Sequence, residues 1–448
     1  MTDTLIHNAE IVNEGRRFIG YVAIEGAVIS AVGEGAPTEA LLNNANHCID
    51  AKGALLLPGA IDDQVHFRDP GLTHKADIAS ESKAAVAGGV TSFMDMPNTK
   101  PPTTTLEALN DKYRHAEECS AANFSFFIGG TNQNIDVLKA VDFSSTCGVK
   151  LFLGSSTGNM LVDDSNAIAR IFAEIPAVIA IHSEDETIIR NNIQLFRQRY
   201  GENLPVQYHP LIRSAEACYE CTARAVELAH RHGTRLNVLH LSTARELSLF
   251  DAATPLADKR VTAEVCVHHL WFSDADYERL GNRIKCNPAI KTIDDRNALR
   301  KGLVDGHIDI VATDHAPHLL SEKQGNCLTA ASGMPLVQFS LVAMLEMAGQ
   351  GIMSFQQVVE KMCHAPATLY RIKRRGFIRT GYFADLVLLR RDPYTVSSQM
   401  ILSKCGWSPF EGTSLSWRVD TTFVNGQIAF QNGTVSDQTN GCRLQFDV

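Results

Sequence analysis

Residues 57–71 read Leu57-Pro58-Gly59-Ala60-Ile61-Asp62-Asp63-Gln64-Val65-His66-Phe67-Arg68-Asp69-Pro70-Gly71. An apolar run passes into a polar cluster and then a Pro-Gly turn, which is the pattern of a short buried strand. Because side chains alternate across a strand, we expect Asp62, Gln64, His66 and Arg68 on one side. Four polar groups beside an apolar run need a ligand, a metal or one another. The alternative is an edge strand with a solvated face.

The composition is that of a globular chain with a substantial core. Its 448 residues, 45% hydrophobic and 20% charged, allow two or three domains or one large barrel with an accessory domain. A net charge of -9 without a basic tract argues against nucleic acid or a membrane surface as partner. No signal-like or membrane-spanning apolar run is visible, and the 11 cysteines follow no framework spacing. We therefore expect a cytoplasmic protein.

The middle of the chain alternates short apolar strands with helical patterns such as residues 80–87 and 215–232. Together with the opening stretch, eight strands are predicted. The other seven cover residues 91–96, 124–129, 148–153, 177–182, 236–240, 261–265 and 308–314. Eight such alternations predict an α/β fold, a parallel (β/α)8 TIM-like barrel over residues 57–372.

Both ends of the chain have a different pattern, with short alternating strands punctuated by glycine. These strands are predicted over residues 5–12, 21–26, 28–32, 385–389 and 421–430. Within the last of them, Asn425-Gly426 is a hairpin turn signal. Two β segments around a different middle predict one small β-sandwich domain, composed of residues 1–56 and 373–448.

Polar residues follow the predicted barrel strands, where the catalytic groups of such barrels lie. In chain order they are His66, Arg68, Asn98, Lys150, His182, His240, Asp314, His315 and His318. One histidine at a strand end is explained more simply as a hydrogen-bonded core residue. Several imidazoles and a carboxylate at successive strand ends instead form the ligand set of catalytic zinc, which keeps a position open for water.

Lys150 is unusual because it lies among apolar residues in a strand that should be buried on both faces. An isolated ammonium there is costly, so its pKa should fall or it must find a partner. A neutral lysine amine can react with carbon dioxide to form a carbamate, an anionic ligand able to bridge two metal ions. The alternative is a lysine that extends to solvent at the barrel rim.

Seven segments together resemble the amidohydrolase superfamily, and within it the dihydroorotases of the class that includes the domain of the multifunctional animal enzyme. They are QVHFRDPG (64–71), DMPNT (95–99), KLFLGSSTG (150–158), IHSED (181–185), HLST (240–243), ATDHAPH (312–318) and GYFADLV (381–387). The resemblance covers nearly the whole chain, and the motifs occur in order.

The resemblance implies a zinc centre. By analogy, His66, carboxylated Lys150 and Asp314 would hold one zinc ion, and Lys150, His182 and His240 the other. A metal-bound hydroxide would be the nucleophile, and Asp314 the general acid/base that carries its proton to the leaving nitrogen. The implied reaction is the reversible cyclisation of N-carbamoyl-L-aspartate to (S)-dihydroorotate in pyrimidine (UMP) biosynthesis.

The resemblance also implies residues that hold this small-molecule substrate. They are Arg68, Asn98, Asn287, His318, Ser332 and Gly333. The substrate carboxylate needs a cation and planar donors, which Arg68 supplies in bidentate geometry. Asn98 and Asn287 each have an alternative explanation as plain turn residues.

One residue departs from the family. The expected His-x-His of the first strand is Gln64-Val65-His66 here, and a glutamine amide is a much poorer zinc ligand than an imidazole. Gln64 therefore leaves open whether the chain binds one or two zinc ions and whether it is an inactive partner protein. A hydantoinase, dihydropyrimidinase or allantoinase activity is a separate alternative. Assembly into a homo-oligomer also stays open. Asp62 is expected to support the metal ligands from behind.

Overall fold

The computed structural model describes residues 2–154 and 160–447. Within them, eight parallel strands form one sheet in sequence order, and a bridge between Val65 and His315 nearly closes it into a barrel. All eight predicted barrel strands are confirmed. They are β6 (Ala60–Val65), β7 (Val90–Asp95), β8 (Asn123–Gly129), β9 (Gly148–Phe152), β10 (Ile179–His182), β11 (Leu236–Val238), β12 (Val261–Cys266) and β13 (Ile310–Ala312).

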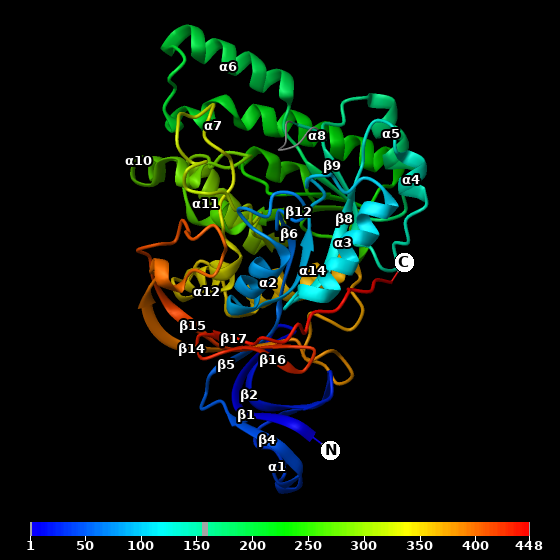
Figure 1. Ribbon diagram of the computed structural model, residues 1–448, viewed down its shortest axis with the longest axis vertical. Coiled ribbons are helices and arrows are strands. Elements are labelled where there is room, and N and C mark those ends of the chain that lie inside the picture. The colour runs from blue at the N-terminus through cyan, green and yellow to red at the C-terminus, as the bar shows by residue number, and fades with distance from the viewer. Residues whose placement is uncertain (1, 155–159, 448) are drawn as a thin grey trace.

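Helices surround the barrel (Figure 1). The longer ones are α2 (Ile78–Ala87), α3 (Leu106–Cys119), α5 (Ser165–Glu174), α6 (Glu186–Tyr200), α8 (Ala215–His232), α11 (Ile293–Asp305) and α12 (Ser340–Gly349). Shorter ones are α1 (Glu39–Asn44), α4 (Ile135–Lys139), α7 (His209–Ile212), α9 (Val267–Trp271), α10 (Tyr277–Leu280), α13 (Phe355–Val359) and α14 (Ala365–Tyr370). The predicted helix α8 begins after an N-cap serine, Ser214, and ends at Gly233 in the left-handed conformation, as helix ends commonly do. No described helix is long and apolar enough to cross a membrane.

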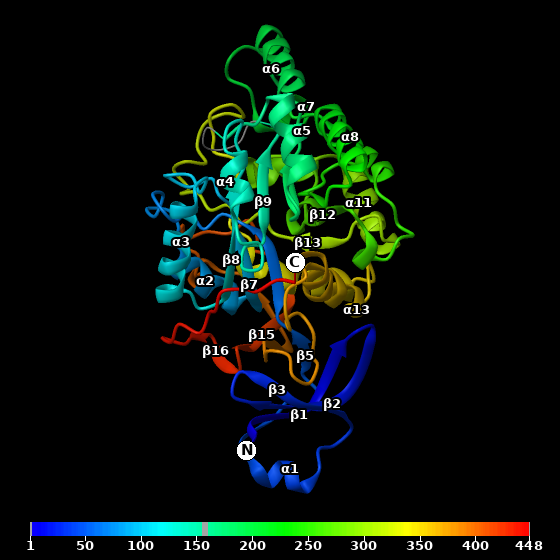
Figure 2. The ribbon, with the colours of Figure 1, turned by 90° about the vertical axis from the view of Figure 1, so that its right-hand side faces the viewer.

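The two chain ends form one nine-stranded sheet within the described residues, below the barrel in Figure 2. Its strands are β1 (Thr2–Asn13), β2 (Arg16–Glu25), β3 (Val28–Glu34), β4 (Ala45–Asp50), β5 (Leu55–Pro58), β14 (Leu386–Thr395), β15 (Ser414–Val424), β16 (Gln427–Gln431) and β17 (Thr434–Val435). The halves meet at β5, which pairs with β1 on one side and β14 on the other. The predicted separate sheet from both termini is therefore confirmed.

The chain passes from this sheet into the barrel at Gly59, between β5 and β6. Its backbone N–H donates to the carbonyl of Asp385 at 2.8 Å, which ties the first barrel strand to β14. A Cβ at this position would lie 2.0 Å from Oγ1 of Thr91, so only glycine permits the approach. The opening stretch therefore joins the two parts of the fold before it reaches its polar cluster.

Candidate active site

One cavity brings together nearly all the residues predicted to form a site. It is lined by Gln64, His66, Arg68, Asn98, Lys150, Phe152, His182, His240, Asn287, Asp314, Ala316, Ser332 and Gly333. Gln64, Lys150, Phe152 and His182 lie in β6, β9 and β10, and the other residues belong to segments that follow barrel strands, as the fold predicts. His318 lies just behind this wall, in contact with Arg68. The motif segment Ser155-Ser156-Thr157-Gly158 lies outside the described residues.

Lys150 is 1% exposed and extends from the middle of β9. Burial lowers its pKa to about 7, although the negative charges of Glu264 and Asp314 oppose this shift. The amine is therefore substantially neutral at physiological pH, which is the form that reacts with carbon dioxide. Because the side chain is buried, the structure does not support the alternative of a lysine that extends to bulk solvent.

His182 and His240 form one side of the site, beside Lys150. Nδ1 of His182 lies 3.1 Å from Nε2 of His240, while Nε2 of His182 lies 2.9 Å from Glu184. Arg213 donates to Glu184 at 3.0 Å. Although burial opposes it, the charge of Arg213 and the contact with His182 hold the pKa of Glu184 well below its usual range. Glu184 therefore stays ionised and orients the His182 ring.

His66 and Asp314 form the other side. Nε2 of His66 lies 3.0 Å from Oδ1 of Asp314, and Nδ1 of His66 lies 2.7 Å from Oδ1 of Asn98. Since an amide oxygen only accepts, Asn98 holds the proton of His66 on Nδ1 and directs Nε2 toward Asp314. The amide nitrogen of Gln64 lies 3.4 Å from the same carboxylate oxygen.

These donors fit a metal centre. Two ligands 2.0–2.1 Å from one tetrahedral zinc ion lie about 3.3 Å apart, close to the 3.1 Å between the His182 and His240 nitrogens. Burial lowers the pKa of both rings, so both are neutral and able to bind a cation. Gln64 is the weakest metal ligand among these residues, since its amide nitrogen, and not its oxygen, faces Asp314.

Arg68 is a buried cation that faces the cavity. It is 3% exposed and makes no ion pair within the described part of the chain. Its guanidinium instead donates to the carbonyl of Pro317 at 3.1 Å and lies 3.1 Å from Nε2 of His318. A buried charge without a counter-ion is costly, so this corner of the cavity is suited to an anionic group of a ligand.

A further part of the cavity wall is formed by Asn287, Ser332 and Gly333. Oδ1 of Asn287 lies 3.1 Å from His209. Gly333 has a φ of +130° and no room for a Cβ, which would meet the carbonyl of Ala316 at 2.6 Å. The buried ammonium of Lys323 donates to the carbonyl of Gly333 at 2.7 Å. This wall is therefore a fixed loop that presents backbone groups to the cavity.

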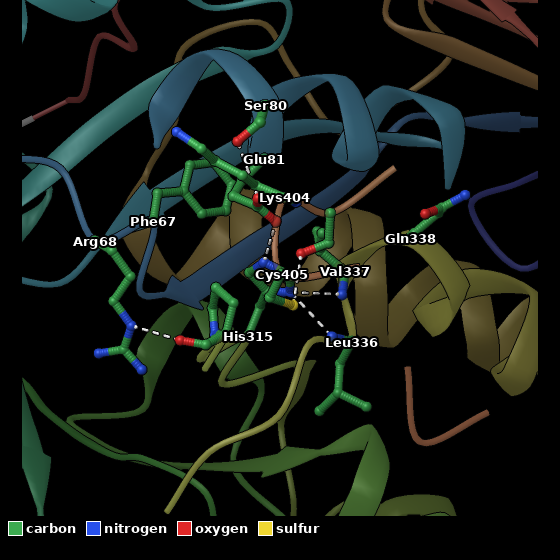
Figure 3. Close-up of polar contacts among 12 residues, drawn as sticks. Phe67, Arg68, Ser80, Glu81, His315, Leu336, Val337, Gln338, Lys404 and Cys405 are labelled. Carbon is green, nitrogen blue, oxygen red and sulfur yellow. Dashed lines mark hydrogen bonds and ion pairs between the residues drawn. The ribbon is translucent and has the colours of Figure 1, made fainter. Parts of the chain in front are cut away.

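His315, next to Asp314, does not line the cavity, and its ring lies among Glu81, Leu336 and Val337 (Figure 3). Its Nε2 lies 2.8 Å from Glu81 in α2, and its Nδ1 accepts from the backbone N–H groups of Leu336 and Val337. Glu81 also accepts from the backbone N–H of Lys404 at 2.9 Å. This strand-end histidine therefore fastens the barrel to the segment that enters α12 and to the C-terminal part of the chain.

Asp62 supports the site indirectly. Its carboxylate accepts from Oγ1 of Thr313 at 2.6 Å and from the Thr313 backbone at 3.2 Å. Burial raises its pKa to about 7. Because Thr313 precedes Asp314, this contact fixes the backbone from which Asp314 extends.

Five residues that line or support the site were not predicted: Phe152, Ala316, Glu184, Arg213 and Lys75, whose ammonium lies 3.2 Å from Nδ1 of His318. Glu184 stands two residues after His182, and a carboxylate at that spacing is the signal that could have found it. Phe152 and Ala316 are apolar wall residues and carry no such signal. Arg213 and Lys75 belong to loops, and their contacts depend on the closed barrel.

The chain matches the model of the amidohydrolase family over residues 55–429, and it therefore belongs to that family. It is 32% identical to a protein of Methanosarcina acetivorans named dihydroorotase, over 97% of this chain and 94% of the relative. It is 30% identical to a Bacillus velezensis protein named allantoinase, over 96% and 94%. The solved structure of an L-hydantoinase (dihydropyrimidinase) from Arthrobacter aurescens superposes with a TM-score of 0.93 at 27% identity, over 99% and 100%.

These relatives define the class of enzyme. The protein is a hydrolase that acts on cyclic amides, and its substrate is a small molecule. Enzymes of this family are generally metal-dependent, in agreement with the donors gathered in the cavity. The family contains several cyclic-amide specificities, so the substrate has to be argued from the residues of the cavity.

Proposed function

We propose that the protein is a zinc-dependent dihydroorotase, which interconverts N-carbamoyl-L-aspartate and (S)-dihydroorotate in pyrimidine (UMP) biosynthesis. The observation that carries the proposal is the buried guanidinium of Arg68, which makes no ion pair with the residues that the structure describes and lies beside the proposed metal ligands. Dihydroorotate combines a cyclic amide with a carboxylate, so it offers one group to each half of the cavity. The identity of 32% and 34% to two relatives named dihydroorotase, over nearly the whole chain, supports the same choice.

The metal would be held by the residues that the resemblance implies. His66, Asp314 and Lys150 would bind one zinc ion, and Lys150 as its N6-carboxylate would share the other with His182 and His240. The zinc, when bound, lowers the pKa of water and so supplies the nucleophile near neutral pH. Glu184 holds the His182 ring in place, and Asn98 keeps the His66 proton on Nδ1.

Asp314 would move the proton of the reaction. Its Oδ1 faces both His66 and Gln64 inside the cavity, and its backbone is held through Thr313 by Asp62. In ring opening, the carboxylate takes the proton of the attacking water and delivers it to the leaving amide nitrogen. In ring closure, the same group runs the steps in reverse, as a general acid/base must.

The substrate carboxylate would lie against Arg68, with Asn98 and His318 beside it. Arg68 is fixed by its hydrogen bond to Pro317, so it needs little reordering to grip an anion. Asn287 and the backbone at Ser332 and Gly333, which also line the cavity, would hydrogen-bond the pyrimidine ring. The charge of Arg68 and these hydrogen-bonding groups together would fix one orientation of the ring over the metal site.

A second candidate function is hydrolysis of a cyclic amide without a carboxylate, as by a hydantoinase, dihydropyrimidinase or allantoinase. The likeness to the L-hydantoinase structure and to the protein named allantoinase favours it. It leaves Arg68 without an anion, since such substrates offer no carboxylate to the guanidinium. A third candidate is an inactive partner protein. Its only support is Gln64 in place of a metal-binding histidine, and it predicts a chain without bound zinc.

The test is side-by-side turnover of dihydroorotate, hydantoin and allantoin by the purified protein, with zinc measured on the same sample. We expect dihydroorotate to be the preferred substrate by a wide margin. Hydantoin or allantoin turnover without dihydroorotate activity would establish the second candidate. Protein without zinc, with an unmodified Lys150 and no turnover of any of the three, would establish the third.

The proposal places the enzyme in the cytoplasm, which is supported by the eleven cysteines, all of them free. A reducing compartment preserves buried thiols of this kind. Gln64 would weaken zinc binding at one of the two proposed metal positions. One zinc ion should therefore be held more tightly than the other.

A further inference from the structure

His318 lies between two cations, and the hydrogen bonding at its two ring nitrogens is in conflict. Nε2 lies 3.1 Å from the Arg68 guanidinium, and Nδ1 lies 3.2 Å from the ammonium of Lys75. Arginine and lysine only donate, and a neutral imidazole accepts at one nitrogen alone. Burial and the positive charges of Arg68, Lys75 and Lys323 hold the pKa of His318 well below its usual range, although a hydrogen bond with the Ser332 backbone opposes this. The ring is therefore neutral. Both contacts therefore cannot be hydrogen bonds at the same time.

Glu322 resolves the conflict on the Nδ1 side. One carboxylate oxygen lies 2.7 Å from Nζ of Lys75, and the other lies 3.5 Å from Nδ1 of His318. The carboxylate also accepts from the backbone N–H of Leu319 at 2.7 Å, which fixes its place. Nδ1 thus faces a donor, Lys75, and an acceptor, Glu322. Nε2 faces the donor Arg68, and the backbone of Ser332 is a further hydrogen-bond acceptor for the ring.

The two sides of the ring therefore allow two tautomers. In the first, Nε2 accepts from Arg68, and the proton on Nδ1 points to Glu322. A carboxylate bound at Arg68 takes over the guanidinium as its own donor. It also needs a proton on Nε2, and Nδ1 then accepts from Lys75. The change moves one proton between the ring nitrogens by exchange with water, and the net charge stays constant.

We propose that the Lys75–Glu322 pair is a positioning device that lets His318 change tautomer when a carboxylate ligand binds beside Arg68. The proposal rests on the dihydroorotase function, and it adds Lys75 and Glu322 to the residues that set specificity. Neither residue lines the cavity, so both act through His318. Lys75 is buried, while Glu322 is about one third exposed on its side chain, so the pair closes the cavity from outside.

Two variants separate the members of the pair. Lys75→Met removes the donor for Nδ1, and we expect the KM for dihydroorotate to rise about tenfold while kcat changes little. Glu322→Gln replaces the acceptor by an amide whose N–H can donate to Nδ1, which should favour the proton on Nε2 already without ligand. Lys83→Met is the matched control, because Lys83 is exposed in the neighbouring helix α2 and should leave KM and kcat unchanged.

The decisive experiment is nitrogen NMR of metal-loaded protein labelled with ¹⁵N-histidine, with the His318 signals assigned from a His318→Asn sample. We expect the proton on Nδ1 in the free protein and on Nε2 with saturating orotate, which keeps the ring carboxylate. Glu322→Gln should show Nε2–H in both states. A free wild-type ring already protonated on Nε2, or a tautomer unchanged by bound orotate, would overturn the proposal.

The same experiment distinguishes this proposal from the proposed function. If dihydroorotate is turned over and orotate binds without a tautomer change, the function stands and the switch is wrong. If neither dihydroorotate nor orotate binds, the function is wrong, and the switch as a carboxylate response falls with it. An unchanged KM in Lys75→Met would likewise contradict the role of the pair.

Discussion

The side-chain amide of Gln64 faces the carboxylate of Asp314 at 3.4 Å, on the same oxygen that contacts His66 at 3.0 Å. An amide N–H donates to this oxygen and so offers no lone pair to a cation. The other end of the amide, its oxygen, lies 3.7 Å from the thiol of Cys266. The first of the proposed metal positions would therefore have His66, Asp314 and Lys150 as its strong donors, one imidazole fewer than the family pattern.

Replacing Gln64 by histidine should strengthen this position. An imidazole nitrogen binds zinc far better than an amide, so we expect Gln64→His to raise the zinc content toward about two ions per chain. The measurement is metal analysis after equilibration at a fixed free zinc concentration. Gln64→Asn, which keeps the amide, is the control and should not gain zinc. An unchanged zinc content in Gln64→His would contradict the assigned weakness.

Lys150→Ala should abolish the link between the two metal positions. We expect activity to fall at least about 100-fold, with partial recovery when acetate or propionate supplies a carboxylate in place of the carbamate. Steady-state rates with and without the acid test this. Lys139→Ala, on the surface in α4, is the control. Full activity of Lys150→Ala without added acid would rule out the bridging role.

Carboxylation of Lys150 should depend on pH around neutrality. Because burial lowers the lysine pKa to about 7, the neutral amine fraction rises about tenfold from pH 6 to pH 8 and then levels off. Metal-free protein at a fixed concentration of dissolved ¹³CO2 should form the carbamate, seen by ¹³C NMR, with this profile. A rate that keeps rising tenfold per pH unit to pH 9 would indicate an ordinary lysine.

The same shift gives a stability change with a defined sign. Between pH 7 and the usual lysine pKa of 10.5, the unfolded chain holds one proton more than the folded chain. The free energy of unfolding of the metal-free, unmodified protein should therefore increase with pH across this window. Lys150→Met should remove this part of the pH dependence, which is measured by denaturant unfolding at several pH values. An identical slope in the variant would show that Lys150 is not its source.

Glu184 should contribute to metal binding through His182 without touching the cavity. Glu184→Gln removes the charge that balances Arg213 and weakens the hold on the imidazole. We expect a 10- to 100-fold lower zinc affinity, the usual effect of losing such a partner, measured by competition with a chelator. Glu174→Gln on the surface of α5 is the control. An unchanged affinity would mean that the His182 ring is held by other contacts.

The fold was largely predictable because its signal is local. Each barrel strand is a short apolar run bounded by turns, and residues 310–312 and 236–238 are strands despite their shortness. The cluster of site residues followed from topology alone, since parallel strands bring their C-terminal ends together. Lys150 stood out because its charge conflicts with a buried strand, and the structure places it in the cavity.

The supporting contacts were not predictable because they join distant segments through loop geometry. Lys75 and Glu322 are 247 residues apart, and neither belongs to a recognisable motif. His315 is the opposite case, because the sequence places it among the site residues although its side chain does not enter the cavity. It follows Asp314 directly, yet Asp314 has a φ of +47°, and this turn sends the next side chain toward Glu81 instead of the cavity. The alternation of side chains along a strand does not predict such a turn.

The most direct test of the central claim is the ratio of kcat/KM for dihydroorotate to that for dihydrouracil, the same ring without the carboxylate. With Arg68 buried and unpaired, we expect the ratio to be on the order of 10⁴, and Arg68→Gln should reduce it toward unity by lowering only the dihydroorotate value. Equal or faster turnover of dihydrouracil by the wild-type enzyme would contradict the account.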